Sequence, residues 1–226
     1  MKKLLYIFSL VLATTAISQT SNSLDFEKLK LNQALTYGDK AVAAAAMYNI
    51  ISLEGPQSTY KDSLAYLYFN ARNYISCFLV VNDILESKKD NLELLEMKAI
   101  SLESMGVKEK ASETYEELLA MTNSNYHAYK LAELKFSINK FEEAYTFVKK
   151  ADGLPDDGNI QVTFQVNKNY NQNVDLKAAI AYLEGIIALN LEKNEEAKIS
   201  FERAVKIFPE FVLAKSKLTT LTATDE

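Results

Sequence analysis

The residue types that most often perform catalysis are scarce in this sequence. His127 is the only histidine and Cys77 the only cysteine, so neither a histidine-based metal cluster nor a histidine pair can form. Carboxylates are numerous, but they occur in runs such as Glu116-Glu117 and Glu142-Glu143, which are typical of solvated helix faces. No glycine-rich loop that could cradle phosphate is present. These observations predict a protein that is not an enzyme and that uses no metal or other cofactor.

Both singular residues have ordinary structural interpretations. Cys77 lies in the apolar run of residues 75–81, and no neighbouring base or positive charge would activate its thiol, so we expect it to be buried. We expect His127 near the start of a helix, on the surface or partly packed. Because one cysteine cannot form an internal disulfide, the stability of the fold must come from packing.

The composition is that of an ordinary globular protein. The chain has 226 residues, of which 48% are hydrophobic and 24% charged, and its formal net charge is -5. A mildly acidic chain without a basic patch predicts no nucleic-acid partner. With only six glycines and three prolines, few positions can interrupt a helix.

The first residues have the pattern of a secretory signal peptide. Lys2 and Lys3 precede an apolar run at residues 4–13, and small residues follow at the two positions that a signal peptidase reads. We therefore predict a signal peptide over residues 1–18, with cleavage before Gln19. The mature protein would be exported, either periplasmic or secreted, with no membrane span. The alternative is an uncleaved leader that remains as an anchor.

A set of small residues recurs along the chain at spacings of 34, 34, 33 and 53 residues. These residues are Ala43, Cys77, Ala111, Ala144 and Ala197. The larger residues four positions after them are Met47, Val81, Tyr115, Val148 and Phe201. A second set of small residues lies in the expected first helices of the later repeats: Ala65, Ala99, Ala132 and Gly185. The first repeat departs from this pattern, because the larger Leu31 stands at the equivalent position. Such periodicity is typical of repeat architectures, in which neighbouring units stack to bury their apolar faces.

Each period contains two amphipathic stretches of about 13–16 residues, which predicts two helices per unit. Short breaks separate the two helices of each pair. The breaks are Tyr37-Gly38-Asp39, Ala71-Arg72-Asn73, Met105-Gly106-Val107, Ile138-Asn139-Lys140 and Glu192-Lys193-Asn194. After Pro209, residues 210–222 predict a closing helix that covers the last repeat.

This pattern resembles the tetratricopeptide repeat family, whose unit of about 34 residues folds as two antiparallel helices. The residues that match best, all in the last repeat, are Gly185, Ala197, Phe201, Ala204 and Pro209. The resemblance implies an all-α fold, a right-handed superhelical solenoid of antiparallel helix pairs, in a single domain over residues 19–226. The expected repeats are residues 24–57, 58–91, 92–124, 125–157 and 178–211.

Residues 156–175 interrupt the helical pattern and account for the spacing of 53. Apolar residues alternate there with polar ones, as in a strand. The apolar row is Ile160, Val162, Phe164 and Val166. Three alternatives remain for this insertion: a mobile loop, a segment that lies over the array or folds back as a hairpin with residues 170–174, or a strand that pairs with a partner.

The resemblance also implies a concave groove, lined by the first helix of each repeat, that holds an extended peptide or a helix. The residues that the register places on this face are aromatic or acidic. They are Tyr66, Phe69, Glu96, Glu103, Tyr126, Tyr129, Glu133, Phe136 and Tyr182. Aromatic rings give contact area at low entropy cost, and carboxylates favour a basic or neutral partner. The alternative is that many of these rings belong to the core between repeats.

Two functions follow from this pattern. The first is a non-enzymatic scaffold or adaptor of the cell envelope that binds a partner protein or peptide in the groove. The second is a structural subunit of a larger envelope assembly, such as secretion or outer-membrane assembly machinery. The second function predicts an apolar outer surface that a partner covers, so that the isolated protein aggregates or oligomerises.

Overall fold

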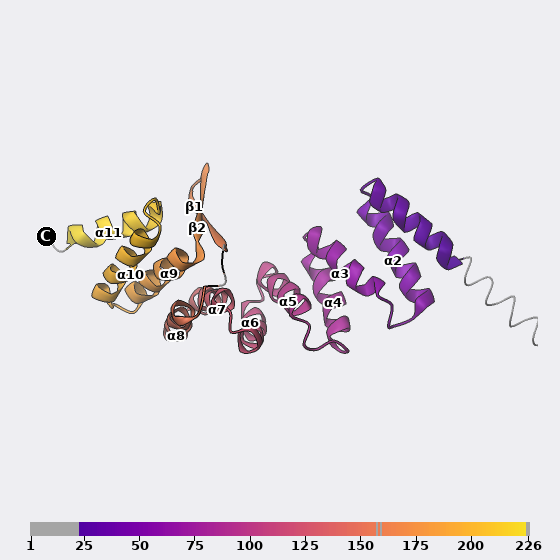
Figure 1. The fold of residues 1–226 in the computed structure, drawn as a ribbon, viewed down its shortest axis with the longest axis horizontal. Helices are drawn as coiled ribbons and strands as arrows, with labels where there is room; N and C mark the ends of the chain where they lie inside the picture. Colours follow the sequence, from indigo (N-terminus) through magenta and orange to yellow (C-terminus); the bar gives the residue numbers. More distant parts are fainter. Residues whose placement is uncertain (1–22, 157, 159, 225–226) are drawn as a thin grey trace, which may run out of the picture. The chain divides into compact units, whose positions relative to one another are not determined.

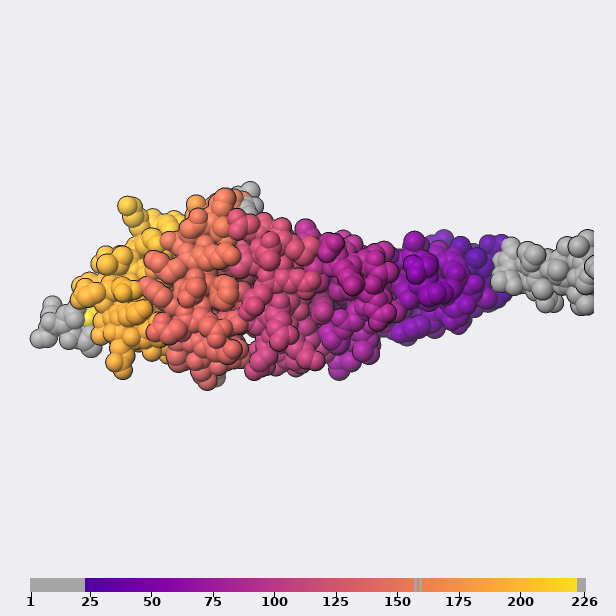
Figure 2. Space-filling view, turned by 90° about the horizontal axis from the view of Figure 1, so that it is seen from below, coloured from indigo at the N-terminus to yellow at the C-terminus, as the bar shows by residue number. Residues whose placement is uncertain are grey.

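A computed structural model describes residues 23–156, 158 and 160–224, so the predicted signal peptide lies outside the described residues. The chain divides into two compact units, Met1–Met105 and Gly106–Glu226, here called the N-terminal and the C-terminal unit. Each unit is built from consecutive antiparallel helices (Figure 1). Within each unit, segments that are neighbours in the sequence adjoin on the surface (Figure 2). The predicted all-α repeat architecture is thus confirmed.

The N-terminal unit begins with a helix at residues 23–36. It continues with α2 (Lys40–Glu54), α3 (Tyr60–Asn70), α4 (Tyr74–Leu85) and α5 (Leu92–Ser104). Three of these helices begin at a polar side chain that accepts a hydrogen bond from a backbone N–H of the first turn. The capping residues are Asp39, Asn73 and Asn91. Such caps satisfy donors that the helix itself leaves unpaired, which fixes where each helix starts.

The C-terminal unit contains six helices and a hairpin among its described residues. The helices are α6 (Lys108–Thr122), α7 (Asn125–Ser137), α8 (Phe141–Gly153), α9 (Leu176–Asn190), α10 (Asn194–Ile207) and α11 (Val212–Thr224). Two strands, β1 (Gln161–Asn167) and β2 (Tyr170–Asp175), lie between α8 and α9. The final helix α11 packs against α10, as a closing helix must.

The turn inside each helix pair contains one residue in the left-handed conformation. These residues are Gly38, Arg72, Gly106, Asn139 and Glu192. Their spacings of 34, 34, 33 and 53 equal those of the small residues. The same turn geometry therefore recurs at the same point of every period, although only two of the five positions hold the glycine that this conformation favours.

The small residues that recur in the sequence are fully buried between helices. Ala43, Cys77, Ala111, Ala144 and Ala197 are all 0% exposed. At Gly185 an added Cβ would lie 2.6 Å from Cε1 of Phe201, so the ring fills the space that a side chain would need. A small residue is thus required there because α9 and α10 approach each other closely.

The insertion forms an antiparallel hairpin, which makes the second of the three alternatives correct and the mobile-loop interpretation wrong. Val162 pairs with Val174 and Phe164 with Gln172, and the register is irregular between Gln165 and Asn167. The predicted apolar row is half-buried, whereas the alternating polar residues of β1 are exposed. The hairpin stands between α8 and α9 (Figure 1), and its apolar face packs against residues of α9, α10 and α11.

The alanine-rich run of residues 41–46 is buried on one side of α2 only. Ala43 and Ala46 are buried, but Ala41 and Ala45 are exposed, because no described residue covers that side of the first repeat. In the described part of the chain, no helix combines the length and the hydropathy that crossing a membrane requires.

Candidate protein-interaction surface

The residues predicted to line a groove fall on four helices in two units. Those of the N-terminal unit are Tyr66 and Phe69 on α3 and Glu96 and Glu103 on α5. Those of the C-terminal unit are Tyr126, Tyr129, Glu133 and Phe136 on α7 and Tyr182 on α9. The two sets are therefore described separately.

In the N-terminal unit, Tyr66 connects α3 to α5. Its hydroxyl donates a hydrogen bond to the carboxylate of Glu93, and this bond, with partial burial, raises the pKa of Tyr66 to about 12. The residue is 36% exposed, so part of its ring faces solvent while its hydroxyl is held in place. Phe69 is half-buried, with its ring 6.2 Å from that of Tyr74 in an edge-to-face arrangement. Glu96 and Glu103 lie further along α5 and are half-buried.

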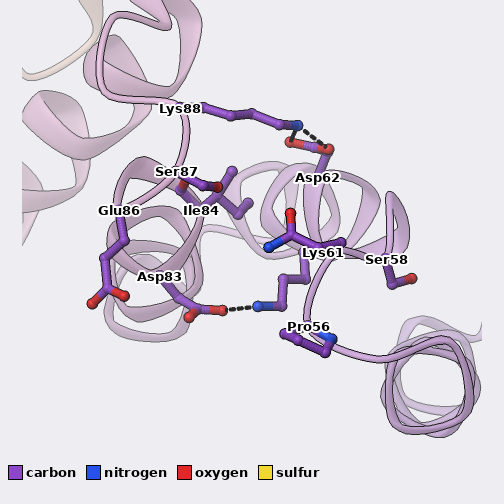
Figure 3. Close-up of a pocket in the computed structure, with 10 residues that line it drawn as sticks. Pro56, Ser58, Lys61, Asp62, Asp83, Ile84, Glu86, Ser87 and Lys88 are labelled. Carbon is purple, nitrogen blue, oxygen red and sulfur yellow. Dashed lines mark hydrogen bonds and ion pairs between the residues drawn. The ribbon is translucent and has the colours of Figure 1, made fainter.

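A cavity of about 210 Å³ lies beside the first turn of α3 (Figure 3). Lys61 forms an ion pair with Asp83, and Nζ of Lys88 lies 3.1 and 2.8 Å from the two carboxylate oxygens of Asp62. These four charges compensate one another across the cavity. It is also smaller than the roughly 300–1,000 Å³ of most small-molecule pockets. The cavity therefore provides a polar border to the α3 surface instead of a ligand site.

In the C-terminal unit, Tyr129 is part of the core and not of a free surface, which corrects the prediction. It is 1% exposed because α7 packs between α6 and α8. Its hydroxyl donates to Oε1 of Glu133 at 2.8 Å, and Oε2 of Glu133 lies 3.0 Å from Nζ of Lys130. Tyr126 and Phe136 are half-buried, and the Phe136 ring lies 5.4 Å from that of Phe141.

Tyr182 does not face an open groove either, because the hairpin covers it. The Phe164 ring stands edge-on to the Tyr182 ring at 5.5 Å, and the rings of Phe201 and Phe211 lie 5.6 and 4.9 Å away. Burial raises the pKa of Tyr182. The apolar row of β1 thus occupies the surface of α9 that was predicted to receive a partner.

Two side chains that connect elements of the C-terminal unit were missed. Glu184, almost fully buried on α9, binds Lys149 of α8 at 3.2 Å and Arg203 of α10 at 2.5 Å. Arg203 in turn binds Asp152 at 2.7 Å. A signal for this network was present, since Glu184 is a lone charge inside the apolar run of residues 178–189.

The second missed side chain is that of Gln172, which is buried on β2. Its carbonyl oxygen accepts from the backbone N–H of Val212 at 3.1 Å, and its amide donates to the carbonyl of Glu210. It therefore caps α11 from the hairpin. Nothing in the polar stretch around Gln172 distinguishes it from its asparagine neighbours.

The two singular residues are both buried. Cys77 is 0% exposed, as predicted, and burial raises the pKa of its thiol. His127 is 4% exposed, more deeply buried than expected, and its Nδ1 lies 2.8 Å from Oγ1 of Thr122. Among the described residues no group of three or more His, Cys, Asp or Glu side chains could hold a metal ion.

Comparison with known proteins supports the repeat assignment. The tetratricopeptide repeat family model matches residues 178–211. The solved structure of YrrB, a tetratricopeptide repeat protein with an unusual peptide-binding site, has a TM-score of 0.63 at 15% identity, covering 90% of this chain and 96% of that one. A MamA structure has a TM-score of 0.62 at 12% identity, covering 82% and 92%. MamA from Desulfovibrio magneticus RS-1 has a TM-score of 0.60 at 12% identity, covering 84% of this chain and 97% of that one. No curated protein matches the sequence.

The family match and the structure identify the same repeating unit, a pair of antiparallel helices. The last repeat matches the family model, and the period of that repeat, with its buried small residues and its left-handed turn, recurs along the preceding helices. Residues 178–211 therefore match a tetratricopeptide repeat, and the described chain has the fold of tetratricopeptide repeat proteins.

Proposed function

We propose that this protein is a non-enzymatic scaffold or adaptor that binds a partner protein or peptide on the α3–α5 surface of its N-terminal unit. Tetratricopeptide repeat folds are typical of protein-interaction scaffolds, and one structural relative, YrrB, has a peptide-binding site. The observation that carries the proposal is the partly exposed ring of Tyr66, fixed by its hydrogen bond to Glu93. A ring held in advance loses little entropy when a partner covers it.

The chemistry of this surface favours a neutral or basic partner. Asp62, Glu93, Glu96 and Glu103 supply carboxylates on α3 and α5, and Lys88 pairs with Asp62 at the border of the cavity. An aromatic ring surrounded by carboxylates suits a segment that presents an apolar side chain beside lysine or arginine. The C-terminal unit contributes less to this proposal, because Tyr129 is buried and Tyr182 lies under the hairpin.

The proposed location is the cell envelope, as a periplasmic or secreted protein. Its support is the leader pattern of residues 1–18 alone. Mass spectrometry of the protein from fractionated host cells should find Gln19 as the first residue in the periplasmic or extracellular fraction. A chain that starts at Met1 and sediments with membranes would favour the anchored alternative.

A position-specific crosslink tests the binding surface. A photoreactive phenylalanine analogue at position 66 should crosslink a partner in native envelopes, whereas the same analogue at position 75 should not. Ile75 is a matched control because it is a more exposed apolar residue of the same unit, on α4. Equal crosslinking at both positions, or none at either, would contradict the proposal.

Charge substitution tests the chemistry of the partner once it has been captured. Glu93→Lys should weaken binding of a basic partner by about tenfold or more, and Glu93→Gln should weaken it less. Because Glu93 is exposed, neither change should unfold the unit. Tighter binding by the lysine variant would mean that the partner is acidic and that the electrostatic argument is wrong.

The second candidate function, a structural subunit of a larger envelope assembly, is favoured by the outer face of the first helix. Phe26 and Leu29, one turn apart, are 64% and 56% exposed. End repeats of soluble arrays normally present polar outer faces, so this apolar pair is unusual. Replacing both residues by serine should release the protein from its native assembly, while leaving crosslinking at position 66 unchanged if the first function is correct.

A further inference from the structure

The hairpin has an open edge on β1. The two-stranded sheet consists of β1 and β2 only, and β1 pairs with β2 along one side. Among the described residues, no loop or helix backbone donates to or accepts from residues 161–167. The other side of β1 therefore presents free N–H and C=O groups, which form a template for an added strand.

The usual protections of an open edge are absent from the first five residues of β1. The stretch Gln161-Val162-Thr163-Phe164-Gln165 contains no charged residue and no proline. The one irregularity of the ladder, between Gln165 and Asn167, follows this stretch and does not interrupt it. Natural proteins normally place lysine, proline or a bulge where strand addition must be prevented. An unprotected edge in an ordered hairpin indicates that strand addition is permitted.

The same stretch is complementary to itself. When two copies are placed antiparallel with Thr163 at the centre, Val162 of one protomer lies opposite the partner's Phe164, and Gln161 lies opposite the partner's Gln165. The two threonines face each other. β-branched residues beside aromatic ones, and threonine beside threonine, are among the favourable cross-strand pairs. No like charges meet in this register.

We propose that two copies of this chain associate through β1, forming a continuous four-stranded antiparallel sheet in the order β2–β1–β1–β2 around a two-fold axis at Thr163. The interface is isologous, so it closes at a dimer and does not extend into fibres. A two-stranded ribbon is marginal by itself, and the β1–β1 pairing adds a third ladder to the two that the separate hairpins have. This dimer goes beyond partner binding on α3 and α5.

The hairpin is held in a fixed position before it meets a second copy. Val174 is fully buried, the Phe164 ring lies 5.0 Å from that of Phe211, and Gln172 binds the start of α11. On the opposite, exposed face, Oγ1 of Thr163 donates to Oδ1 of Asn173 at 2.8 Å. An edge that is already ordered loses little conformational entropy on pairing, which is the condition for association through so few residues.

The structure supplies a matched pair of variants. Thr163→Lys places two like charges opposite each other at the two-fold axis, whereas Asn173→Lys adds the same charge on the same exposed face but on β2. Both variants lose the same hydrogen bond, so they affect the isolated hairpin alike. The full-length gene product, purified from cells that export it, is studied by sedimentation velocity over about a hundredfold range of dilution.

The unmodified protein and Asn173→Lys should be dimers that dissociate on dilution, and Thr163→Lys should dissociate at least about tenfold more readily. An equimolar mixture of Thr163→Lys and Thr163→Glu should recover the dimer, because only the proposed register places position 163 opposite itself. A protein that is monomeric throughout, or a dimer that both lysine variants weaken equally, would overturn the proposal.

Disulfide trapping gives an independent readout. Thr163→Cys should form a dimer on mild oxidation, and Asn173→Cys should not. The native Cys77 does not interfere, because it is buried and its thiol has a raised pKa. Equal crosslinking of both variants would show random collision and contradict the register.

Discussion

The last repeat and the first repeat share one plan but differ in what covers them. Over the last repeat, β1, β2 and α11 enclose an aromatic cluster of Phe164, Tyr182, Phe201 and Phe211. The first repeat has a core of smaller residues, with Leu31, Ala34, Met47 and Ile50 as members, and it packs against the second repeat on one side. Its outer face leaves Phe26 and Leu29 exposed.

This difference shows where the stability of each end comes from. The last repeat is stabilised inside the chain, because Phe211 fills the space between α9 and the hairpin and Gln172 fixes the start of α11. The first repeat has fewer buried large side chains and therefore a smaller hydrophobic contribution. A repeat at the end of an array, with a neighbour on one side only, is the part that opens most readily.

The largest expected effect is on the aromatic cluster. Phe211→Ala should destabilise the last repeat by about 3–5 kcal/mol, because the ring is fully buried and contacts three others. Phe26→Ala in the first repeat should cost less than about 0.5 kcal/mol, since that ring is exposed. Urea denaturation of both variants measures the difference, and a similar cost for the two would erase the contrast between the ends.

Equivalent positions in the two repeats should respond to opposite changes. Position 185 holds glycine under the Phe201 ring, so Gly185→Ala should cost about 1–3 kcal/mol through overpacking. The corresponding residue of the first repeat is Leu31, which is buried, so Leu31→Ala should cost about 2–5 kcal/mol through a cavity. Thermal unfolding detects both changes.

A second substitution separates overpacking from other causes. Phe201→Leu should reduce the cost of Gly185→Ala when the two are combined, because the shorter side chain leaves room for a Cβ. If the two costs simply add, the contact between Gly185 and Phe201 does not explain the glycine.

A smaller effect is expected at the cap of α11. Gln172→Ala should cost about 1–2 kcal/mol, because it leaves the N–H of Val212 and the carbonyl of Glu210 without their partner. Hydrogen exchange should become faster in the first turn of α11 and stay unchanged in the helix at residues 23–36. Gln165→Ala, on the exposed face of β1, is the control and should leave exchange in α11 as it is.

The smallest effect concerns alkaline pH. Burial, together with a hydrogen bond to the hydroxyl of Tyr48, raises the pKa of Tyr68 to about 12, beside the first repeat. Because the folded value exceeds the unfolded value of about 10, this contribution to stability is complete below pH 10 and is lost as the pH rises towards 12. Tyr68→Phe should reduce the loss of unfolding free energy over this window. An unchanged slope would show that Tyr68 is not responsible.

The repeat plan could be predicted from the sequence because its signals are local and periodic. The positions of Ala43, Cys77 and Ala197, and the breaks at Gly38 and Gly106, recur with the period, and all appear in the structure where the period places them. The strand pattern of residues 160–166 was equally clear, since it alternates where its surroundings do not.

The candidate surface was less predictable, because exposure depends on contacts between distant residues. Register alone placed Tyr129 and Tyr182 on an open face, but α6 and α8 enclose the first and the hairpin covers the second. The partner of Gln172, the start of α11, lies about 40 residues further along the chain. No periodic signal reports such a contact, whereas the lone charge of Glu184 in an apolar run is a signal from which its buried ion pairs could have been predicted.

The hairpin has one more consequence, which follows from how it joins the helices. The N–H of Leu176 binds the carbonyl of Ile160 at 3.0 Å, and α8 and α9 pack directly against each other although the insertion separates them in the sequence. The chain thus leaves the repeat and returns to it at nearly one place. The spacing of α8 and α9 therefore does not depend on the length of the hairpin, whereas the cover of the last repeat depends on Phe164 and Gln172 within it.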